Sequence, residues 1–555
     1  MGVMNVGKRD GVTVSDSGQM FARFFTEVTL EAKRLQQALN ADPMKLEEIE
    51  REVLELFGHG AGLFLTGLIA ECMKQPEYQA CCEEVRKEYP VPLKLGEDRQ
   101  IQIRMANGFT CFATTRYCAP IRKPGDDSEI PGIDIELTQF GFSGGDSPAL
   151  VSKVARATAI MPLALATKEL QRDGIKLDDS VVDRISNQAA KELLTVRERN
   201  LELLRSGELV AGNELEGKTV SVQIDGARTR IRSVLEELCP MENFGKSQSE
   251  ATGKPSLGRS KEARRRAMFE ALWREPKVIT IYVHDSEGRR DKSTLATIDG
   301  TFGDAESIQT IVAMHLHRLG AAKAKSISFN SDGAKWIWDR IDTILELAKI
   351  PDTVAIYRIL DVYHACENLN NALAILYPDP KARREIYREL RTKLRDTGWE
   401  EVANRLATVY HDKYMQSQTQ PATELTADQK ECLRVINYIR NHGQQGHMNY
   451  GMYRLMGLPL GSGAIESAIR CVVNLRMKSN GIFWRIDRAE EMLMLRATVL
   501  SDRWDENRLI AKQQMKANQK LSLPIWPRVH RIVAFHSPTT FDFPVLTIQS
   551  TFLDC

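Results

Sequence analysis

Four features that would place a protein in a class at first sight are missing from this sequence of 555 residues. None of its ten cysteines forms a CxxC pair, which argues against a zinc ribbon or a thioredoxin-type motif. No apolar run near the N-terminus reaches the roughly 20 residues that a bilayer span requires. The longest run there, residues 61–70, is expected to be a buried helix, and no membrane association is expected.

A secretion signal, with its charged, apolar and small-residue sections, is also missing from the first residues. Reduced thiols and an intracellular location are the expectation that follows.

An excess of charge of one sign is missing as well. Lys and Arg number 75 and Asp and Glu number 74, so the net charge is +1 and a uniformly basic protein that coats nucleic acid is excluded. Hydrophobic residues make up 43% and charged residues 27%, a globular mix that argues against wholesale disorder. The length suggests about three or four domains.

The pattern of apolar residues divides the chain into seven segments. Two of these segments have the pattern of apolar and polar residues of an α/β region, and a helical segment lies between them. In order, the segments are 1–90 (helical), 91–145 (a β-hairpin and a linker), 146–210 (helical), 215–370 (first part of an α/β core), 371–456 (all-helical), 457–505 (last part of the core) and 506–555 (a C-terminal tail).

The helical segment 146–210 has two interpretations. Helical patterns on both sides of Gly174 fit a helix-turn-helix that docks in a DNA groove. The same pattern fits the plain geometry of a helical bundle, and the sequence does not decide between them.

Within the α/β core, apolar and polar residues alternate or cluster as in strands and helices. The predicted order is three strands, helix, strand, helix, strand. The strands are predicted near 220–225, 277–283, 295–302, 326–332 and 353–360, and the helices near 305–319 and 336–347.

Three acidic residues stand out by position. Asp225 (QIDGA) and Asp332 (SDGAKWIW) each end a predicted strand before a glycine, and Glu466 (GSGAIESA) begins the helix after a glycine-rich loop. Neighbouring strands lie about 4.8 Å apart, so the two aspartates could share metal ions if their strands pair. The plainer alternatives are turn or capping roles for the aspartates and a surface pair of Glu466 with Arg470.

Carboxylates in such a cluster suit phosphodiester chemistry. Two divalent ions can serve the attacking and the leaving oxygen together. Hard oxygen ligands favour Mg²⁺, with Mn²⁺ as a substitute, over Zn²⁺.

Four blocks of the sequence together resemble a known family. They are QIDGARTRI, SDGAKWIW, DVYHACENL and GLPLGSGAIESAIRCVVNLRMKSNGIFW. In this order they resemble a DDE transposase of the ISKra-type insertion-sequence family, related more distantly to Mutator-like transposases. The resemblance covers about residues 218–504.

The resemblance implies an α/β catalytic core like ribonuclease H, with a mixed five-stranded sheet, an all-helical insertion and, before the core, a mostly helical N-terminal region. It makes Asp225, Asp332 and Glu466 the catalytic and metal-binding acids. Asp361 and His364 match a Cys/Asp-x-x-His pair of the Mutator-like relatives and take a supporting role. A hydrogen-bonded core position is the alternative for His364.

The same resemblance implies an activity and its partners. The activity is metal-dependent cleavage at the ends of a mobile element and strand transfer into target DNA. The partners are double-stranded DNA and other copies of the chain, on the nucleoid of a prokaryotic cytoplasm. Two rival functions share the acids: a nuclease that cuts without joining, and a non-catalytic DNA-binding protein derived from a transposase.

Relatives often carry a cysteine-rich, zinc-ribbon-like segment before the core. Here only Cys111 and Cys118 fall in the hairpin region, whereas a structural Zn²⁺ site takes four ligands. No zinc is therefore expected.

Basic residues gather in two places that we predict to contact DNA. One is a Ser/Gly-rich loop, Gly245–Ser260, and the basic residues after it, which could order on phosphates or be a solvated linker. The other follows Glu466, where an aromatic residue could stack on a base or pack in the core. The contacts predicted in these two places are Arg264, Arg265, Arg266, Arg470, Arg476, Lys478 and Trp484. Lys335, on the helix turn after Asp332, is predicted to face phosphate as well.

Overall fold

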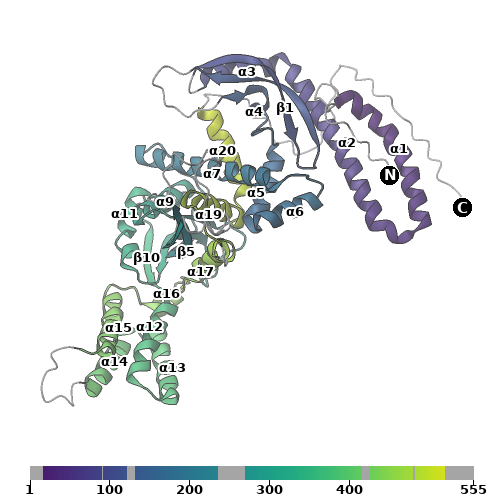
Figure 1. The fold of residues 1–555 in the computed structure, drawn as a ribbon. Helices are drawn as coiled ribbons and strands as arrows, with labels where there is room; N and C mark the ends of the chain where they lie inside the picture. The colour runs from purple at the N-terminus through teal and green to yellow at the C-terminus, as the bar shows by residue number, and fades with distance from the viewer. Residues whose placement is uncertain are drawn as a thin grey trace, which may run out of the picture.

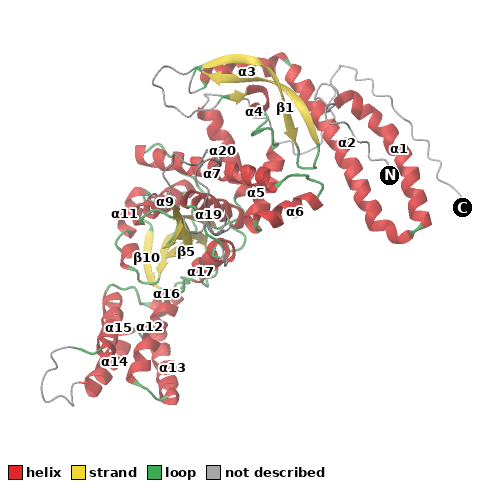
Figure 2. Ribbon diagram, viewed as in Figure 1, coloured by secondary structure: helices red, strands yellow, loops and turns green. Residues whose placement is uncertain are grey.

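The structure is a computed structural model that describes residues 17–89, 92–121, 132–234, 269–414, 425–478 and 482–518. A central α/β core lies between two outlying parts (Figures 1 and 2). One is a helical hairpin with an antiparallel sheet, at the N-terminal end of the chain. The other is a helical lobe that projects from the opposite side of the core.

The N-terminal part begins with a helical hairpin. Its helices are joined through a 3-10 turn that the Asp42 carboxylate caps by accepting a 3.1 Å bond from the Met44 amide. A further helix leads into the three-stranded sheet. The elements are α1 (Ser17–Ala41), η1 (Pro43–Lys45), α2 (Leu46–Lys74), α3 (Pro76–Glu88), β1 (Leu93–Arg104), β2 (Thr110–Pro120) and β3 (Ile133–Asp134).

Helix α2 departs from the expectation of a buried helix. Within residues 61–70, Leu63, Ile69 and Ala70 are buried, but Phe64 and Leu68 are about half exposed. Among the described residues, the span Pro43–Lys74 is also the one that is long and apolar enough to cross a membrane by length and composition. A core helix of a soluble protein passes the same test.

The segment after the sheet is helical: α4 (Ile135–Gln139), α5 (Pro148–Ile160), α6 (Leu163–Arg172) and α7 (Asp179–Ser206). Pro162 separates α5 from α6, and the Asp178 carboxylate caps α7. Helix α7 packs against α5 and against two later helices, α19 (Ile486–Leu500) and α20 (Trp504–Asn518). This packing favours the helical-bundle interpretation over a recognition helix that enters a DNA groove.

The predicted mixed five-stranded sheet is confirmed. Its strand order is β10-β9-β4-β7-β8. Strand β4 pairs in parallel with β9 and β9 with β10, whereas β4, β7 and β8 pair antiparallel. The strands are β4 (Thr219–Gly226), β7 (Lys277–Val283), β8 (Thr297–Thr301), β9 (Ser326–Ser331) and β10 (Ala355–Leu360).

Short helices and a separate hairpin complete this core. A two-stranded antiparallel hairpin, which the sequence did not predict, flanks residues 235–268, which lie outside the described residues. The elements are β5 (Thr229–Val234), β6 (Phe269–Arg274), α9 (Ala305–Leu319), η4 (Ala321–Lys323), α10 (Lys335–Trp338) and α11 (Ile341–Leu347).

Helices alone fill the described residues between β10 and the glycine-rich loop, and they share one hydrophobic core. The chain then returns to the core sheet through α17, a π-helical turn and α18, before α19 and α20. The bounds are α12 (Val362–Leu376), α13 (Pro380–Asp396), α14 (Trp399–Tyr414), α15 (Ala427–Gln444), α16 (Tyr450–Leu455), α17 (Gly463–Ile469), η5 (Arg470–Asn474) and α18 (Leu475–Met477).

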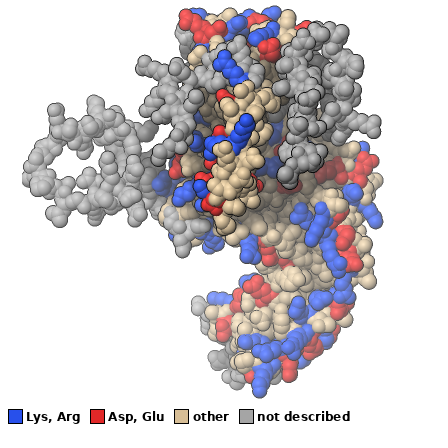
Figure 3. All heavy atoms as spheres, turned by 90° about the vertical axis from the view of Figure 1, so that its right-hand side faces the viewer, with Lys and Arg blue, Asp and Glu red and all other residues tan. Residues whose placement is uncertain are grey.

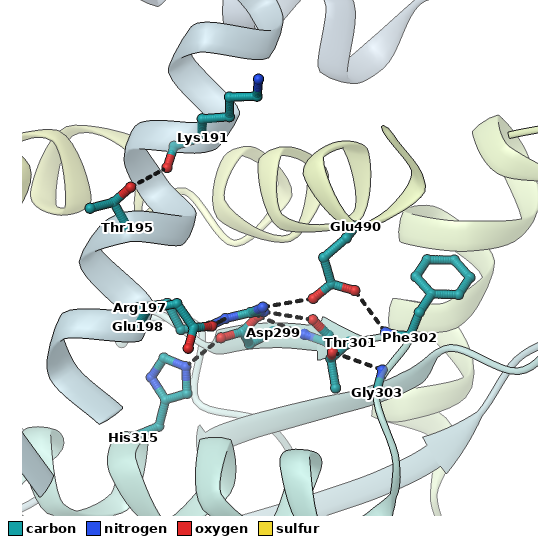
Figure 4. A network of polar contacts seen from close by, with 11 residues as sticks. Lys191, Thr195, Arg197, Glu198, Asp299, Thr301, Phe302, Gly303, His315 and Glu490 are labelled. Carbon is teal, nitrogen blue, oxygen red and sulfur yellow. Dashed lines mark hydrogen bonds and ion pairs between the residues drawn. The ribbon is translucent and has the colours of Figure 1, made fainter. Parts of the chain in front are cut away.

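A buried ionic network ties α7 to the core sheet and to α19 (Figure 4). The Arg197 guanidinium, 5% exposed, donates to Asp299 on β8 at 3.2 Å and to Glu490 on α19 at 2.6 Å. The imidazole of His315 on α9 lies 2.9 Å from the second oxygen of Asp299. Burial lowers the pKa of His315, so the neutral ring donates to the Asp299 carboxylate.

The network predicts a large stability loss for Arg197→Met. The substitution leaves Asp299 and Glu490 without their cation in a buried site, which costs about 3–5 kcal/mol. Urea unfolding followed by circular dichroism measures the loss. Arg199→Met is the matched control on the same helix, because its side chain is 46% exposed and lies 3.9 Å from Glu202. Equal stabilities of the two variants would contradict this role.

Candidate active site

Three parallel strands end at one edge of the core sheet, and an aspartate lies at the end of each. The register pairs Gln223 of β4 with Asn330 of β9, and Asp225 and Asp332 each lie two residues farther along. On the other side, Leu360 of β10 pairs with Ser331, and Asp361 comes next. The three aspartates therefore lie at the ends of neighbouring strands, whose axes are about 4.8 Å apart.

The charges of the predicted acids Asp332 and Glu466 act on the carboxylate of Asp225. The pKa of Asp225 is raised to about 6, mainly by burial. The Gly226 amide and His364 lower it, whereas the charges of Asp332 and Glu466 raise it. The carboxylate accepts a 2.6 Å bond from the Gly226 amide. Such mutual repulsion requires that Asp332 and Glu466 lie within electrostatic reach of Asp225.

Asp332 is held by the turn that follows β9. Its carboxylate accepts bonds from the Ala334 amide (2.9 Å) and the Ser331 hydroxyl (3.1 Å). Gly333 has a φ of +94°, a conformation that glycine adopts without strain. From α15 of the helical lobe, the Tyr438 hydroxyl donates to the backbone carbonyl of Asp332 at 3.1 Å. The lobe thus fixes the backbone of a site residue.

Polar residues inside the sheet hold the loop that presents Glu466. The side-chain amide of Gln223 donates to the Gly461 carbonyl at 3.1 Å, and its oxygen accepts from the Ile465 amide at 3.0 Å. On the next strand, the Asn330 amide donates to the Pro459 carbonyl at 2.6 Å. Sequence reasoning missed both residues, although they lie on the same strand faces as Asp225 and Asp332.

Asp361 is fully buried and acts mainly as an anchor. It accepts bonds from the Ser462 amide (2.9 Å), the Ser462 hydroxyl and the Tyr363 amide (2.6 Å). It thereby caps α12 and ties the glycine-rich loop to the end of β10. The supporting role that was predicted for Asp361 is thus a positioning role for the loop before Glu466.

His364 lies at the edge of the site. Ligand atoms of Asp361, His364 and Glu466 all lie within 4.8 Å of one another. The imidazole is partly exposed and lies 3.7 Å from Glu367, so it is not a fully buried core histidine.

The donor set of the site fits Mg²⁺ or Mn²⁺. Asp225, Asp332 and Glu466 supply hard carboxylate oxygens, the ligands that these ions prefer. Among the described residues, the trio whose ligand atoms lie within 4.8 Å of one another is Asp361, His364 and Glu466. The alternative trio around Asp361 fits less well, because that carboxylate already accepts three hydrogen bonds.

A pocket with an empty volume of about 710 Å³ opens in front of the two aspartates. Lys478, which was predicted to contact DNA, lines it together with Arg228, which was not. Both cations are exposed, so phosphate groups can reach them beside the acids. The signal for Arg228 was its place three residues after Asp225 in QIDGAR.

Among the other predicted DNA contacts, Arg470 is exposed and Arg476 is not. Arg476 is 8% exposed and its guanidinium lies 5.2 Å from the centre of the Trp484 ring, so the prediction of a phosphate contact is wrong for this conformation. Trp484 donates to the Met477 carbonyl at 3.1 Å and packs on a hydrophobic cluster. The core-packing alternative therefore describes Trp484.

Two predicted contacts remain. Lys335 is exposed, but its ammonium pairs with both oxygens of Asp339 at 2.8 and 2.7 Å. Residues Arg264, Arg265 and Arg266 lie outside the described residues.

Comparison with known proteins adds no relative. No family model, no curated protein and no solved structure matched the chain.

The raised pKa of Asp225 predicts a pH-dependent stability difference for Asp225→Asn. The wild-type fold favours the protonated carboxyl, so its stability falls as the pH rises from about 4 to about 6. Without divalent ions at about pH 8, the variant is expected to be more stable by about 3 kcal/mol, and the difference shrinks towards zero near pH 4. Urea unfolding at several pH values measures it. A difference that is constant with pH would contradict the repulsion.

The loop anchor predicts a local effect of Gln223→Leu. The substitution leaves the Ile465 amide and the Gly461 carbonyl without partners, at a cost of about 2–4 kcal/mol. Faster amide hydrogen exchange is expected at Ile465. Gln188→Leu, at an exposed position of α7, is the control and should change neither the stability nor the amide exchange at Ile465. Unchanged exchange at Ile465 in Gln223→Leu would show that the loop is held by other contacts.

Proposed function

We propose that the chain is a DNA transposase that cleaves phosphodiester bonds at element ends and joins them to target DNA. The observation that carries the proposal is the in-register pairing of β4 with β9, which sets Asp225 beside Asp332. The charge of Glu466 acts on the same carboxylate. The family resemblance names these same three residues as its catalytic acids.

The strand arrangement supports the same proposal. In chain order, the five strands lie as third, second, first, fourth and fifth across the sheet, with the second antiparallel to the first. A ribonuclease-H-like core, which the resemblance implies, is the finer fold that we propose for this sheet. The helices between β10 and the glycine-rich loop take the place of the proposed insertion.

Each part of the site has a role in this chemistry. Mg²⁺ held by Asp225, Asp332 and Glu466 would activate the attacking oxygen and stabilise the leaving oxygen. Lys478 and Arg228 bind the phosphates of the DNA beside the acids. Asp361 positions the loop before Glu466, and His364 at the rim is close enough to meet the same DNA strand.

Transposition also has requirements beyond a single site. Two element ends must be brought together, so the active form is proposed to be a homo-oligomer on double-stranded DNA. A nuclease without joining shares every feature described above, and so does a DNA-binding protein that has kept the acids. The product of the reaction, not the geometry, separates these three.

The test is cleavage and joining of DNA that carries the sequences flanking the reading frame, with Mg²⁺. Wild type is expected to cleave the DNA and to join it. Asp332→Asn is expected to reduce both activities by more than about a hundredfold, because asparagine has nearly the size of aspartate but is a weaker metal ligand. Asp339→Asn, an exposed acid on the same segment, is the matched control and should retain activity. Nicked DNA without joined products would favour the nuclease, and binding without chemistry would favour the DNA-binding protein. Equal activity of Asp332→Asn and wild type would refute the assigned acid.

A further inference from the structure

Four arginines follow one another along one side of helix α13 in the helical lobe. They recur at intervals of four, three and four residues, and this spacing places them on one face of the helix. The first three are exposed and the last is partly buried. We call these four residues the α13 stripe: Arg384, Arg388, Arg391 and Arg395.

The apolar face of α13 is covered by the lobe itself. Leu390 and Leu394 are buried in the hydrophobic core of the lobe, and Ile386 and Tyr387 pack against it. A helix that binds a membrane surface needs an apolar face that is free to enter the membrane. The apolar face of α13 is already occupied, so a membrane does not suit the stripe.

The acids of α13 lie beside the stripe and do not neutralise it. Glu385, Glu389 and Asp396 each follow an arginine of the stripe by one residue, so each lies about 100° farther around the helix. Glu389 pairs instead with Lys393 at 3.0 Å. Asp396 pairs with Arg454 of α16 at 3.1 Å. Among the described residues, no acid forms an ion pair with an arginine of the stripe.

This arrangement concentrates positive charge on one helix. Helix α13 has seven Lys or Arg and three Asp or Glu, whereas the whole chain has 75 and 74. Like charges three or four residues apart destabilise a helix, and successive members of the stripe all have this spacing. An anionic ligand on the stripe relieves their repulsion. Figure 3 views the molecule from the side on which α13 lies in Figure 1, and it shows Lys and Arg gathered on the projecting lobe.

The C-terminal end of the stripe reaches the loop that presents Glu466. Arg391 and Arg395 line a pocket with an empty volume of about 620 Å³. Tyr363 and Gly461 also line this pocket. Gly461 belongs to the glycine-rich loop and lies five residues before Glu466. The stripe therefore ends beside the candidate active site.

The geometry of the stripe suits the backbone of double-stranded DNA. Residues 384–395 of a helix span about 16 Å, roughly half a turn of DNA. The planar guanidinium of arginine can bind two phosphate oxygens at once. Single strands are held largely by aromatic side chains on which bases stack. The one aromatic residue of α13, Tyr387, packs on the lobe core instead.

We propose that the α13 stripe binds the backbone phosphates of double-stranded DNA beside the candidate active site, so that the helical lobe holds the DNA. The choice of DNA as the partner rests on the proposed function. The surface is additional to it, because Lys478 and Arg228 meet phosphates at the acids themselves, whereas the stripe lies on the lobe. Phosphate contacts carry no base information, so this binding is independent of DNA sequence.

The salt dependence of DNA binding by the full chain tests the proposal. The probe is a fluorescent duplex of arbitrary sequence, and its anisotropy is measured with EDTA so that no cleavage takes place. Arg388→Gln combined with Arg391→Gln is expected to weaken binding by more than about tenfold. The slope of log affinity against log salt is expected to become shallower by about 2, because each lost phosphate contact removes about 0.9.

Two further double variants serve as controls. Arg405→Gln combined with Lys430→Gln removes the same charge from exposed positions of α14 and α15, on the other side of the lobe in Figure 1. It should leave the affinity and the slope close to those of wild type. Arg388→Lys combined with Arg391→Lys keeps the charge and should keep the wild-type slope. In circular dichroism melting, the glutamine variant of the stripe should unfold no earlier than wild type, because it loses like-charge repulsion.

Three results would overturn the proposal. One is a glutamine variant of the stripe whose affinity and slope equal those of wild type. Another is an equal loss in the control on α14 and α15, which would show a general effect of net charge. The third is unchanged DNA binding together with lost binding of poly-L-glutamate, which would assign the stripe to an acidic protein.

These results are separate from a failure of the proposed function. In all three, the wild-type chain binds duplex DNA, and its cleavage and joining activities are unaffected. A wild-type chain that binds no duplex DNA would contradict the proposed function and the role of the stripe together.

Discussion

The parallel pairing of β4 with β9 is the constraint on which the candidate site depends. It sets Gln223 beside Asn330 and therefore Asp225 beside Asp332, across about a hundred residues of sequence. Slipping this pair by one residue would turn every side chain of the slipped strand to the other face. The buried apolar side chains of both strands, such as Val222 and Phe329, specify the register that the acids require.

Much of the surrounding structure serves to keep repelling carboxylates together. The glycine-rich loop is held by hydrogen bonds to Gln223 of β4, Asn330 of β9 and Asp361, which follows β10. These bonds position Glu466 from the ends of all three parallel strands. The helical lobe contributes Tyr438, which fixes the Asp332 backbone. On the far side, Arg197 neutralises a buried acid of β8. Acids that lack a cation destabilise the fold, and these contacts offset that cost.

The local pattern of apolar residues predicted the strands and helices of the core. The position of the candidate site depends instead on which strands pair in the sheet. The alternation at 220–224 and the apolar run Lys277–Val283 are properties of the strands themselves, so their strands could be predicted. The pairing of β4 with β9 joins segments about a hundred residues apart, so local pattern does not predict it. The adjacency of the two aspartates was therefore predicted only for the case in which these strands pair. The roles of Gln223 and Asn330 were missed because the loop that they hold lies more than a hundred residues away.

Two expectations were wrong for instructive reasons. Arg476 was grouped with its basic neighbours by linear spacing, but the π-helical turn Arg470–Asn474 changes the helical register before it, and the guanidinium lies under Trp484. The run 61–70 was expected to be buried because it is apolar. Composition does not say which side chains of an apolar run the rest of the chain covers, and Phe64 and Leu68 are about half exposed.

Iron-directed cleavage tests the central claim, that residues far apart in sequence form one metal site, most directly. Fe²⁺ replaces Mg²⁺ at carboxylate sites, and with ascorbate and peroxide it generates radicals that cut the nearby backbone. The account predicts cuts next to Asp225, Asp332 and Glu466 in the same protein, competed away by Mg²⁺ and lost together in Asp332→Asn. Cuts at only one of these segments, or cuts that persist in Asp332→Asn, would contradict it.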